Sequence, residues 1–189
     1  MRITGASLLA VVVVSVGSAA GGSIVRRMGL DEMTRAADLI VRGKVEAASS
    51  RYDDPPDEHR IVTDVTVRVQ DCLAGDPGRT GFLTVTVLGG VVEGRGQWVP
   101  GAPRMSVGDD VVLFLRPARV SVDGKPRRTV IGLSQGVFFL SRDPTKGKWT
   151  ARRRLGGLSM LPEAKGPAAE SGMKLEDLIR IVHSAGRSR

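Results

Sequence analysis

The sequence is poor in the residues that stabilise small folds through covalent or metal links. Its 189 residues include one cysteine, two histidines, two tryptophans, one tyrosine and four phenylalanines. A single cysteine excludes an internal disulfide, and two histidines with one cysteine offer no paired ligand spacing for zinc. We therefore expect valine and leucine to fill the interior, and we expect no metal or other cofactor.

The one thiol, Cys72, has two possible states in an oxidising compartment. It is either buried and inert, or exposed and able to pair between chains. Cys72 stands beside Leu73 at the apolar end of a predicted strand. This neighbourhood favours the buried state.

A long hydrophobic run is also missing. Residues 6–16 (ASLLAVVVVSV) follow Arg2 and precede the small residues of 17–20, which is the order of regions in a secretory signal peptide. The run is shorter than the about 20 apolar residues of a membrane-spanning helix, which disfavours an uncleaved anchor. We predict a signal peptide over 1–20, a secreted or periplasmic protein, and no membrane span after cleavage.

The strongest pattern that is present is a β-hairpin over 61–90. Apolar and polar residues alternate in IVTDVTVRV and again in FLTVTV, so each segment has one apolar and one polar face. Between them, Gly75-Asp76-Pro77-Gly78 has the composition of a turn. The pattern predicts two paired strands that lie on a core.

Further short elements precede and follow this hairpin. We expect a helix over 30–37, a strand over 38–47 with a bulge at Gly43, and a strand over 110–115 that is covered on both faces. We also expect an exposed acidic loop over 51–59, a glycine-interrupted strand or hairpin over 91–99, a hairpin around Asp123-Gly124, a pair of strands over 130–133 and 137–140, and a short strand at Trp149.

The end of the chain differs in composition. Residues 152–172 are rich in Gly, Pro and Ala and are predicted to be a linker, like the flexible lead over 21–29. Over 173–186, Leu175, Leu178, Ile179 and Val182 recur with helical spacing, so we expect an amphipathic helix that docks on the domain of residues 30–151.

Many short strands with Gly and Pro turns indicate a mainly β protein. We predict a small closed OB-like Greek-key barrel with a short N-terminal helix and a C-terminal amphipathic helix; a β-sandwich is the alternative. Closure would remove the exposed edges of the sheet.

Several segments are similar to a known family. ADLIVRGKV (37–45), DCLAG (71–75) and VGDDVVLFL (107–115) resemble the netrin-like OB-fold modules typified by tissue inhibitors of metalloproteinases. VPGAPR (99–104) and GLSQG (132–136) resemble segments of uncharacterised exported bacterial proteins. The likeness covers roughly 37–140 and implies the barrel. The inhibitors bind zinc through an N-terminal cysteine, whereas Cys72 lies in mid-chain.

GLSQG also matches the G-x-S-x-G motif of serine hydrolases, and Glu176 or Asp177 with His183 would complete a triad in chain order. The motif needs a helix after the serine, but the apolar residues after Gly136 predict a strand. Asp177 and His183 are six residues apart on one helix and would face apart. We therefore predict that the protein is not an enzyme, with a serine hydrolase through Ser134 as the alternative.

Charged segments suggest ligands of two kinds. Asp53, Asp54, Asp57 and Glu58 supply oxygen atoms that suit Ca²⁺, but they lack the spacing and the glycine of an EF-hand, so a solvated loop is favoured. The net charge is +8, and basic residues concentrate over 116–154: Arg116, Arg119, Lys125, Arg127, Arg128, Lys146, Lys148, Arg152, Arg153 and Arg154. An anionic polysaccharide or envelope surface is the alternative partner there. Export and the scarcity of exposed aromatic residues disfavour nucleic acid.

The sequence thus favours an exported, non-catalytic binding module, inhibitor-like or accessory to the cell envelope, whose partner is a protein or an envelope component. Rigid barrels carry recognition in their connections, so we expect contacts in the loops over 51–59 and 89–104. The residues predicted to contact the partner are Asp53, Asp54, Trp98, Arg104, Arg152, Arg153 and Arg154.

Overall fold

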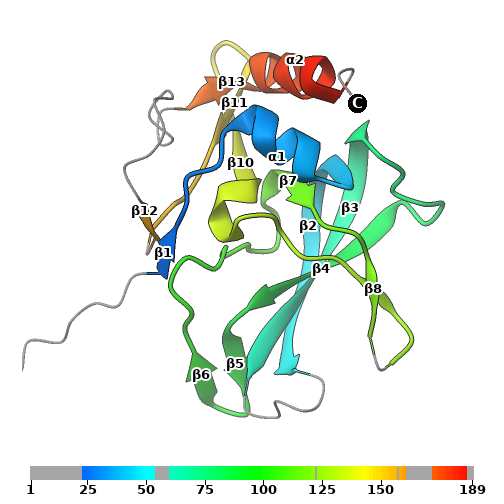
Figure 1. Cartoon of the computed structure of the whole chain (residues 1–189), viewed down its shortest axis with the longest axis vertical. Helices are drawn as coiled ribbons and strands as arrows, with labels where there is room; N and C mark the ends of the chain where they lie inside the picture. Colours follow the sequence, from blue (N-terminus) through cyan, green and yellow to red (C-terminus); the bar gives the residue numbers. More distant parts are fainter. Residues whose placement is uncertain (1–22, 54–59, 122, 157, 161–171, 187–189) are drawn as a thin grey trace, which may run out of the picture.

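A seven-stranded antiparallel sheet forms the centre of the molecule, with the strand order β13-β11-β10-β7-β2-β3-β4 (Figure 1). The computed structural model describes residues 23–53, 60–121, 123–156, 158–160 and 172–186; the predicted signal peptide over 1–20 lies outside them. The strands of this sheet are β2 (Leu39–Tyr52), β3 (Ile61–Ala74), β4 (Phe82–Leu88), β7 (Asp110–Leu115), β10 (Val137–Arg142), β11 (Trp149–Arg152) and β13 (Met173–Lys174). The prediction of a mainly β protein is confirmed.

The hairpin predicted over 61–90 is formed by β3 and β4, which pair from Val62 with Leu88 to Arg68 with Phe82. Val65, Val67 and Val85 are buried on its apolar face, as the alternation predicts. In the turn, Gly75 has a φ of +86° and lies against the Asp38 carbonyl, where a side chain would not fit. Glycine is therefore required at this position.

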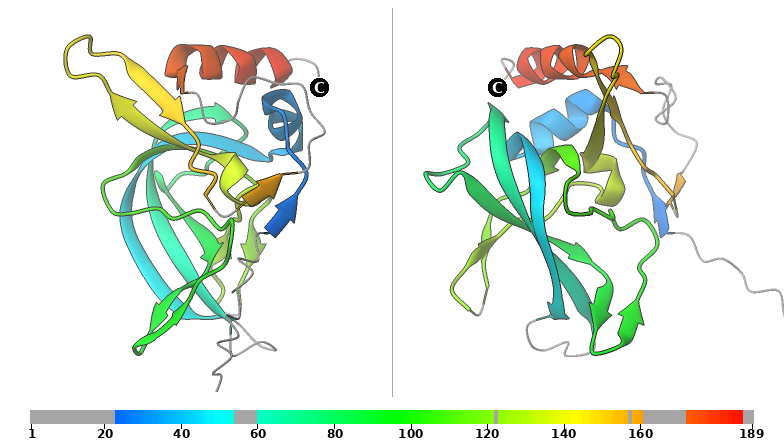
Figure 2. Two further views of the ribbon diagram at one scale, coloured as in Figure 1. Left: turned by 90° about the vertical axis from the view of Figure 1, so that its left-hand side faces the viewer. Right: turned by 180° about the vertical axis from the view of Figure 1, so that it is seen from behind.

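Strand β2 is longer than predicted and pairs with β3 along its whole length. Its last residue, Tyr52, pairs with Ile61, so Arg51 and Tyr52 belong to a strand and not to the acidic loop. The pairing shifts in register at three places, one of them between Arg42 and Gly43. Such bulges increase the twist of a strand, and β2 and β3 curve strongly in Figure 2.

The sheet separates two hydrophobic clusters. On one side, within the curve of the strands, lie residues such as Val41, Val65 and Leu113. On the other side, Phe114 and Phe138 pack under the helices. Alternate residues of β7 enter both clusters, so this strand is covered on both faces, as predicted.

Two helices cover the second cluster. Helix α1 (Leu30–Ala36) confirms the predicted N-terminal helix, and α2 (Leu175–Gly186) confirms the C-terminal one except that Met173 and Lys174 form β13. Leu178 and Val182 are fully buried, and the two helices lie side by side (Figures 1 and 2). Within the described residues, no helix is long and apolar enough to cross a membrane.

Part of the predicted flexible lead and part of the predicted linker form strands. Strand β1 (Ser23–Val25) pairs in parallel with β12 (Leu158–Met160). Beyond β1, the Gln135 side chain accepts a hydrogen bond from the Met28 N–H at 2.8 Å and donates one to the Arg26 carbonyl at 3.1 Å. Residues 23–28 are therefore held to the core; residues 21–22 and 161–171 lie outside the described residues.

The predicted strand pair across Ser134 is also wrong. Leu133–Gly136 is a 3₁₀ helix, η1, and β10 pairs with β7 and β11 instead. Gly132 and Leu133 both have left-handed conformations, with φ of 62° and 58°. This double turn redirects the chain so that residues 130–133 cannot lie antiparallel to β10.

Two small hairpins extend from the sheet. Strands β8 (Arg119–Val120) and β9 (Pro126–Arg127) confirm the hairpin predicted around Asp123-Gly124, and β5 (Gly90–Val92) with β6 (Arg95–Gln97) confirms the one over 91–99.

After β9, the chain bonds to two strands at once. On one side it bonds to β4. The Thr86 N–H donates a hydrogen bond of 2.8 Å to the Arg128 carbonyl, and the Arg128 N–H donates one of 2.9 Å to the Thr84 carbonyl. On its other side, the segment bonds to the end of β7, from the Ile131 N–H to the Phe114 carbonyl at 3.0 Å. Residues 128–131 thus link β4 to β7.

Candidate functional site

Two hollows lie next to each other on one face of the protein. The first, which we call the arginine hollow, has a volume of about 410 Å³, and the second, the tryptophan hollow, about 450 Å³. Val87, Leu88, Ala102 and Pro103 line both. The loop over 89–104 therefore forms a wall between them.

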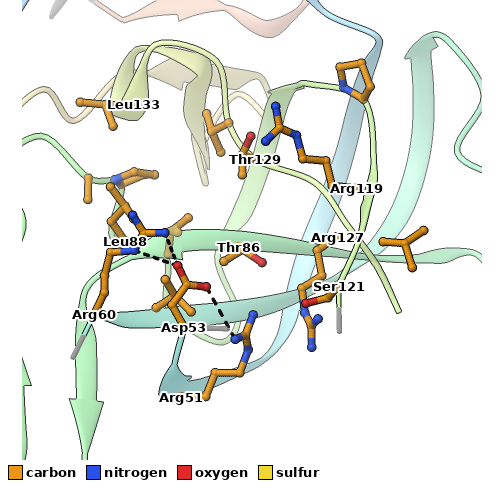
Figure 3. A pocket seen from close by; sticks show the side chains of 17 residues that line it. Arg51, Asp53, Arg60, Thr86, Leu88, Arg119, Ser121, Arg127, Thr129 and Leu133 are labelled. Carbon is orange, nitrogen blue, oxygen red and sulfur yellow. Dashed lines mark hydrogen bonds and ion pairs between the residues drawn. The ribbon is translucent and has the colours of Figure 1, made fainter. Parts of the chain in front are cut away.

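The arginine hollow combines an apolar floor with a charged rim (Figure 3). Its apolar residues are Val62, Val87, Leu88, Ala102, Pro103, Pro117, Val120, Val130 and Leu133. Its charged residues are Arg51, Asp53, Arg60, Arg119 and Arg127. Four arginines beside one aspartate give the rim an excess of positive charge.

Asp64 lies behind this rim and holds two of the arginines. Its Oδ2 atom accepts hydrogen bonds of 2.9 Å from the Nε atoms of Arg51 and Arg127, and its Oδ1 atom accepts one of 2.6 Å from the Thr86 hydroxyl. Burial acts to raise the pKa of Asp64, but the hydrogen bonds and charges of these neighbours prevail and lower it. Asp64 is therefore a carboxylate that fixes the two guanidinium groups.

Arg127 has a second carboxylate partner. Its terminal nitrogens donate to Asp123 at 2.7 and 2.6 Å, and hydrogen bonding to Asp123 is the largest influence that raises the pKa of Arg127. Only 12% of the Arg127 side chain is exposed. This arginine is a rigid part of the wall, because two-point pairing fixes both its position and its plane.

Asp53, which was predicted to contact a partner, forms ion pairs with two arginines of the chain. It accepts a hydrogen bond of 2.8 Å from Arg60 Nε and lies 3.8 Å from Arg51 Nη1 (Figure 3). Asp54 and the rest of the acidic loop over 54–59 lie outside the described residues. Within the described residues, no three His, Cys, Asp or Glu side chains are grouped to hold a metal ion.

Arg119 differs from the other arginines of the hollow. In Figure 3 it lies beside Thr129, on the opposite side of the hollow from Asp53 and Arg60. Its guanidinium has no carboxylate partner among the described residues. Arg119 thus provides positive charge at the mouth that no described side chain neutralises.

The tryptophan hollow contains two of the residues predicted to contact a partner. Trp98 is 60% exposed, and the Arg104 guanidinium lies 5.9 Å from the centre of its ring. Val91, on the hairpin of β5 and β6, is 65% exposed. The hairpin is fixed at its base because the Gln97 side chain accepts a hydrogen bond of 2.6 Å from the Ile61 N–H. An exposed aromatic ring therefore follows directly after an anchored hairpin.

The predicted basic surface over 116–154 is divided. Arg128 pairs with Asp38 at 2.6 Å, and Arg127 pairs with Asp64 and Asp123. The structure therefore does not bring the ten basic residues together on one uncompensated face.

Two arginines that follow β11, Arg153 and Arg154, lie over phenylalanine rings. Arg153 lies 4.5 Å from the ring centre of Phe138, and Arg154 lies 3.9 Å from that of Phe139. Burial and the charge of Arg27 lower the pKa of Arg153 to about 10. These two arginines and the exposed Arg152 line a hollow of about 390 Å³ on β10 and β11. Arg153 and Arg154 act mainly as packing residues that cover the aromatic rings.

The residues of the alternative hydrolase triad are not in contact. Ser134 is 2% exposed, and its hydroxyl has no hydrogen-bond partner among the described residues. His183 is exposed on α2, and Asp177 pairs with Arg180 on the same helix. A strand, β10, begins at Val137 where the motif would require a helix.

Cys72 is exposed, so the expectation of a buried thiol is wrong. Side chains alternate along β3, and Leu73, which is 7% exposed, is the residue that points into the core. The Cys72 thiol is still partly shielded from water, and this burial is the largest of the influences that raise its pKa.

Comparison with protein families found no model that matches the chain, and comparison with curated proteins found no similar sequence. The arginine hollow was not predicted from the sequence, since Arg51 and Arg60 come from one part of the chain and Arg119 and Arg127 from a distant one. One signal was present: Asp64 is a charged residue within the strongly alternating strand β3.

Proposed function

We propose that the protein is an exported, non-catalytic binding module that binds a protein or an envelope component through the loop over 89–104. The observation that carries this proposal is Trp98, which is 60% exposed, follows directly after an anchored hairpin and lines the tryptophan hollow. Tryptophan and arginine are enriched among the residues that dominate binding energy at interfaces. Trp98 and Arg104 provide both at one place.

The scaffold for this loop is proposed to be a closed OB-like Greek-key barrel, as the resemblance to netrin-like modules implies. Residues 128–131 bond to β4 on one side and to β7 on the other. They would complete a ring in the order β2, β3, β4, residues 128–131, β7 and back to β2. The contact of residues 128–131 with β4 is parallel and the one with β7 is antiparallel, which supports a Greek-key path.

Capture of the partner tests this function. The protein is immobilised and exposed to the secreted fraction of its own culture, and the retained components are identified by mass spectrometry. The Trp98→Ala variant should lose most of the retained partner, whereas Phe82→Ala, which removes another half-exposed aromatic ring, should keep it. Equal retention by Trp98→Ala and the unchanged protein would contradict the proposal.

Two further measurements address export and catalysis. Export predicts that the protein recovered outside the cytoplasm begins near Gly21, which N-terminal sequencing reads directly. A fluorophosphonate probe should not label the protein, because the Ser134 hydroxyl is buried without a base in contact. Labelling that disappears in Ser134→Ala would favour the hydrolase instead.

A further inference from the structure

We propose that the arginine hollow binds a small organic anion that has one carboxylate and an apolar chain. This inference is independent of the proposed function, because it concerns the other hollow and a ligand of a different kind. The volume of the arginine hollow, about 410 Å³, lies in the range of small-ligand sites.

The floor of the hollow determines the apolar part of the ligand. Val62, Val87 and Val130 are buried residues whose side chains line it, and Leu133 lines the wall beyond them. An apolar chain that covered this floor would remove water from both surfaces, which favours binding in proportion to the area covered. A small hydrophilic anion such as phosphate would leave the floor uncovered.

The rim determines the charge of the ligand. Arg127 is already held by Asp64 and Asp123, and Asp53 pairs with Arg60, so these guanidinium groups have negative partners. Arg119 has none among the described residues and lies beside Thr129 at the mouth (Figure 3). One carboxylate at this position would accept charge-assisted hydrogen bonds from Arg119 and could also accept one from the Thr129 hydroxyl.

The arrangement also disfavours other ligands. A metal cation would meet the positive charges of Arg119 and its neighbours. A neutral apolar molecule would cover the floor but would leave Arg119 without a partner and partly removed from water. A monocarboxylate with an apolar chain would cover the apolar floor and would also pair with Arg119 at the rim.

Isothermal titration calorimetry of the purified protein with octanoate tests the proposal. We expect saturable binding at one site, with octan-1-ol and acetate each at least about tenfold weaker, because one lacks the charge and the other the chain. Binding should also shift the NMR signals of the Val62, Val87 and Val130 methyl groups.

Two matched variants locate the charge. Arg119→Gln should weaken octanoate binding by about tenfold or more, while Arg180→Gln, an exposed arginine on α2, should leave it unchanged. Both variants should keep the thermal stability of the unchanged protein, since both side chains lie on the surface. The proposal is overturned by octanoate that does not saturate a site, by equal binding of octan-1-ol, or by unchanged affinity in Arg119→Gln.

Discussion

At the scale of single residues, Asp64 has the widest influence on the candidate site. It joins β3 to Arg51 on β2, to Thr86 on β4 and to Arg127 on β9. Only 16% of its side chain is exposed, so the surrounding water screens these charges weakly. Loss of the carboxylate would leave two guanidinium groups partly buried without their common partner.

Asp64→Asn should therefore lower the free energy of unfolding by about 2 kcal/mol at neutral pH, measured by urea denaturation. The neighbours of Asp64 lower its pKa in the folded protein, so its stabilisation is complete above the ordinary aspartate pKa and is lost as the pH falls through the lowered value. The difference between the two proteins should shrink below about pH 4. Asp71→Asn, on the same strand but exposed, should change stability by less than about 0.5 kcal/mol. A constant difference down to the acid transition would refute this electrostatic explanation.

Only part of the site could be predicted at this scale. The sequence identifies Trp98 and Arg104 because they stand in a connection, where a rigid scaffold carries recognition, and the structure brings these two together. It does not show that Arg127 meets Asp64, since 63 positions separate them along the chain. Such pairs depend on how the hairpins fold back, which no local pattern contains.

At the scale of elements, the helices and the two small hairpins follow from the sequence, whereas the turn at Ser134 and strand β12 do not. Helix α2 is amphipathic, and its apolar residues at helical spacing are buried, as Leu178 and Val182 show. The turn at Ser134 was expected to join two strands, but Leu133–Gly136 is a 3₁₀ helix, which the chain enters through left-handed conformations at Gly132 and Leu133. β12 was missed because a three-residue strand in a Gly-rich segment has no detectable period.

Helix α2 is expected to contribute stability through its buried face. Leu178→Ala removes a fully buried side chain from the cluster under the helices and should cost about 3 kcal/mol in the free energy of unfolding. Arg180→Ala, on the exposed face of the same helix, should lower the free energy of unfolding by less than about 0.5 kcal/mol. Chemical denaturation followed by circular dichroism measures both. A cost below about 1 kcal/mol for Leu178→Ala would mean that the helix packs only loosely.

At the scale of the whole molecule, the proposed ring depends on residues 128–131. If these residues close the barrel, the amides of Thr86, Arg128 and Ile131 should exchange with solvent as slowly as those of the central strands. The amide of Lys125, which bonds only to the Asp123 side chain in an exposed turn, should exchange on the order of 100-fold faster. Hydrogen exchange read by NMR distinguishes the two cases. Fast exchange at Thr86 and Arg128 would indicate an open sheet.

The pairing of β1 with β12 also constrains when the protein becomes complete. Ser23 aligns with Leu158, so the strand nearest the start of the described chain finds its partner only near the end. The ribosome synthesises β1 long before β12, so residues 23–25 can form this pair only after residues 158–160 have been made. A chain that stopped before residue 158 would therefore lack the partner of β1, although the bonds of Gln135 to Met28 and Arg26 could still form.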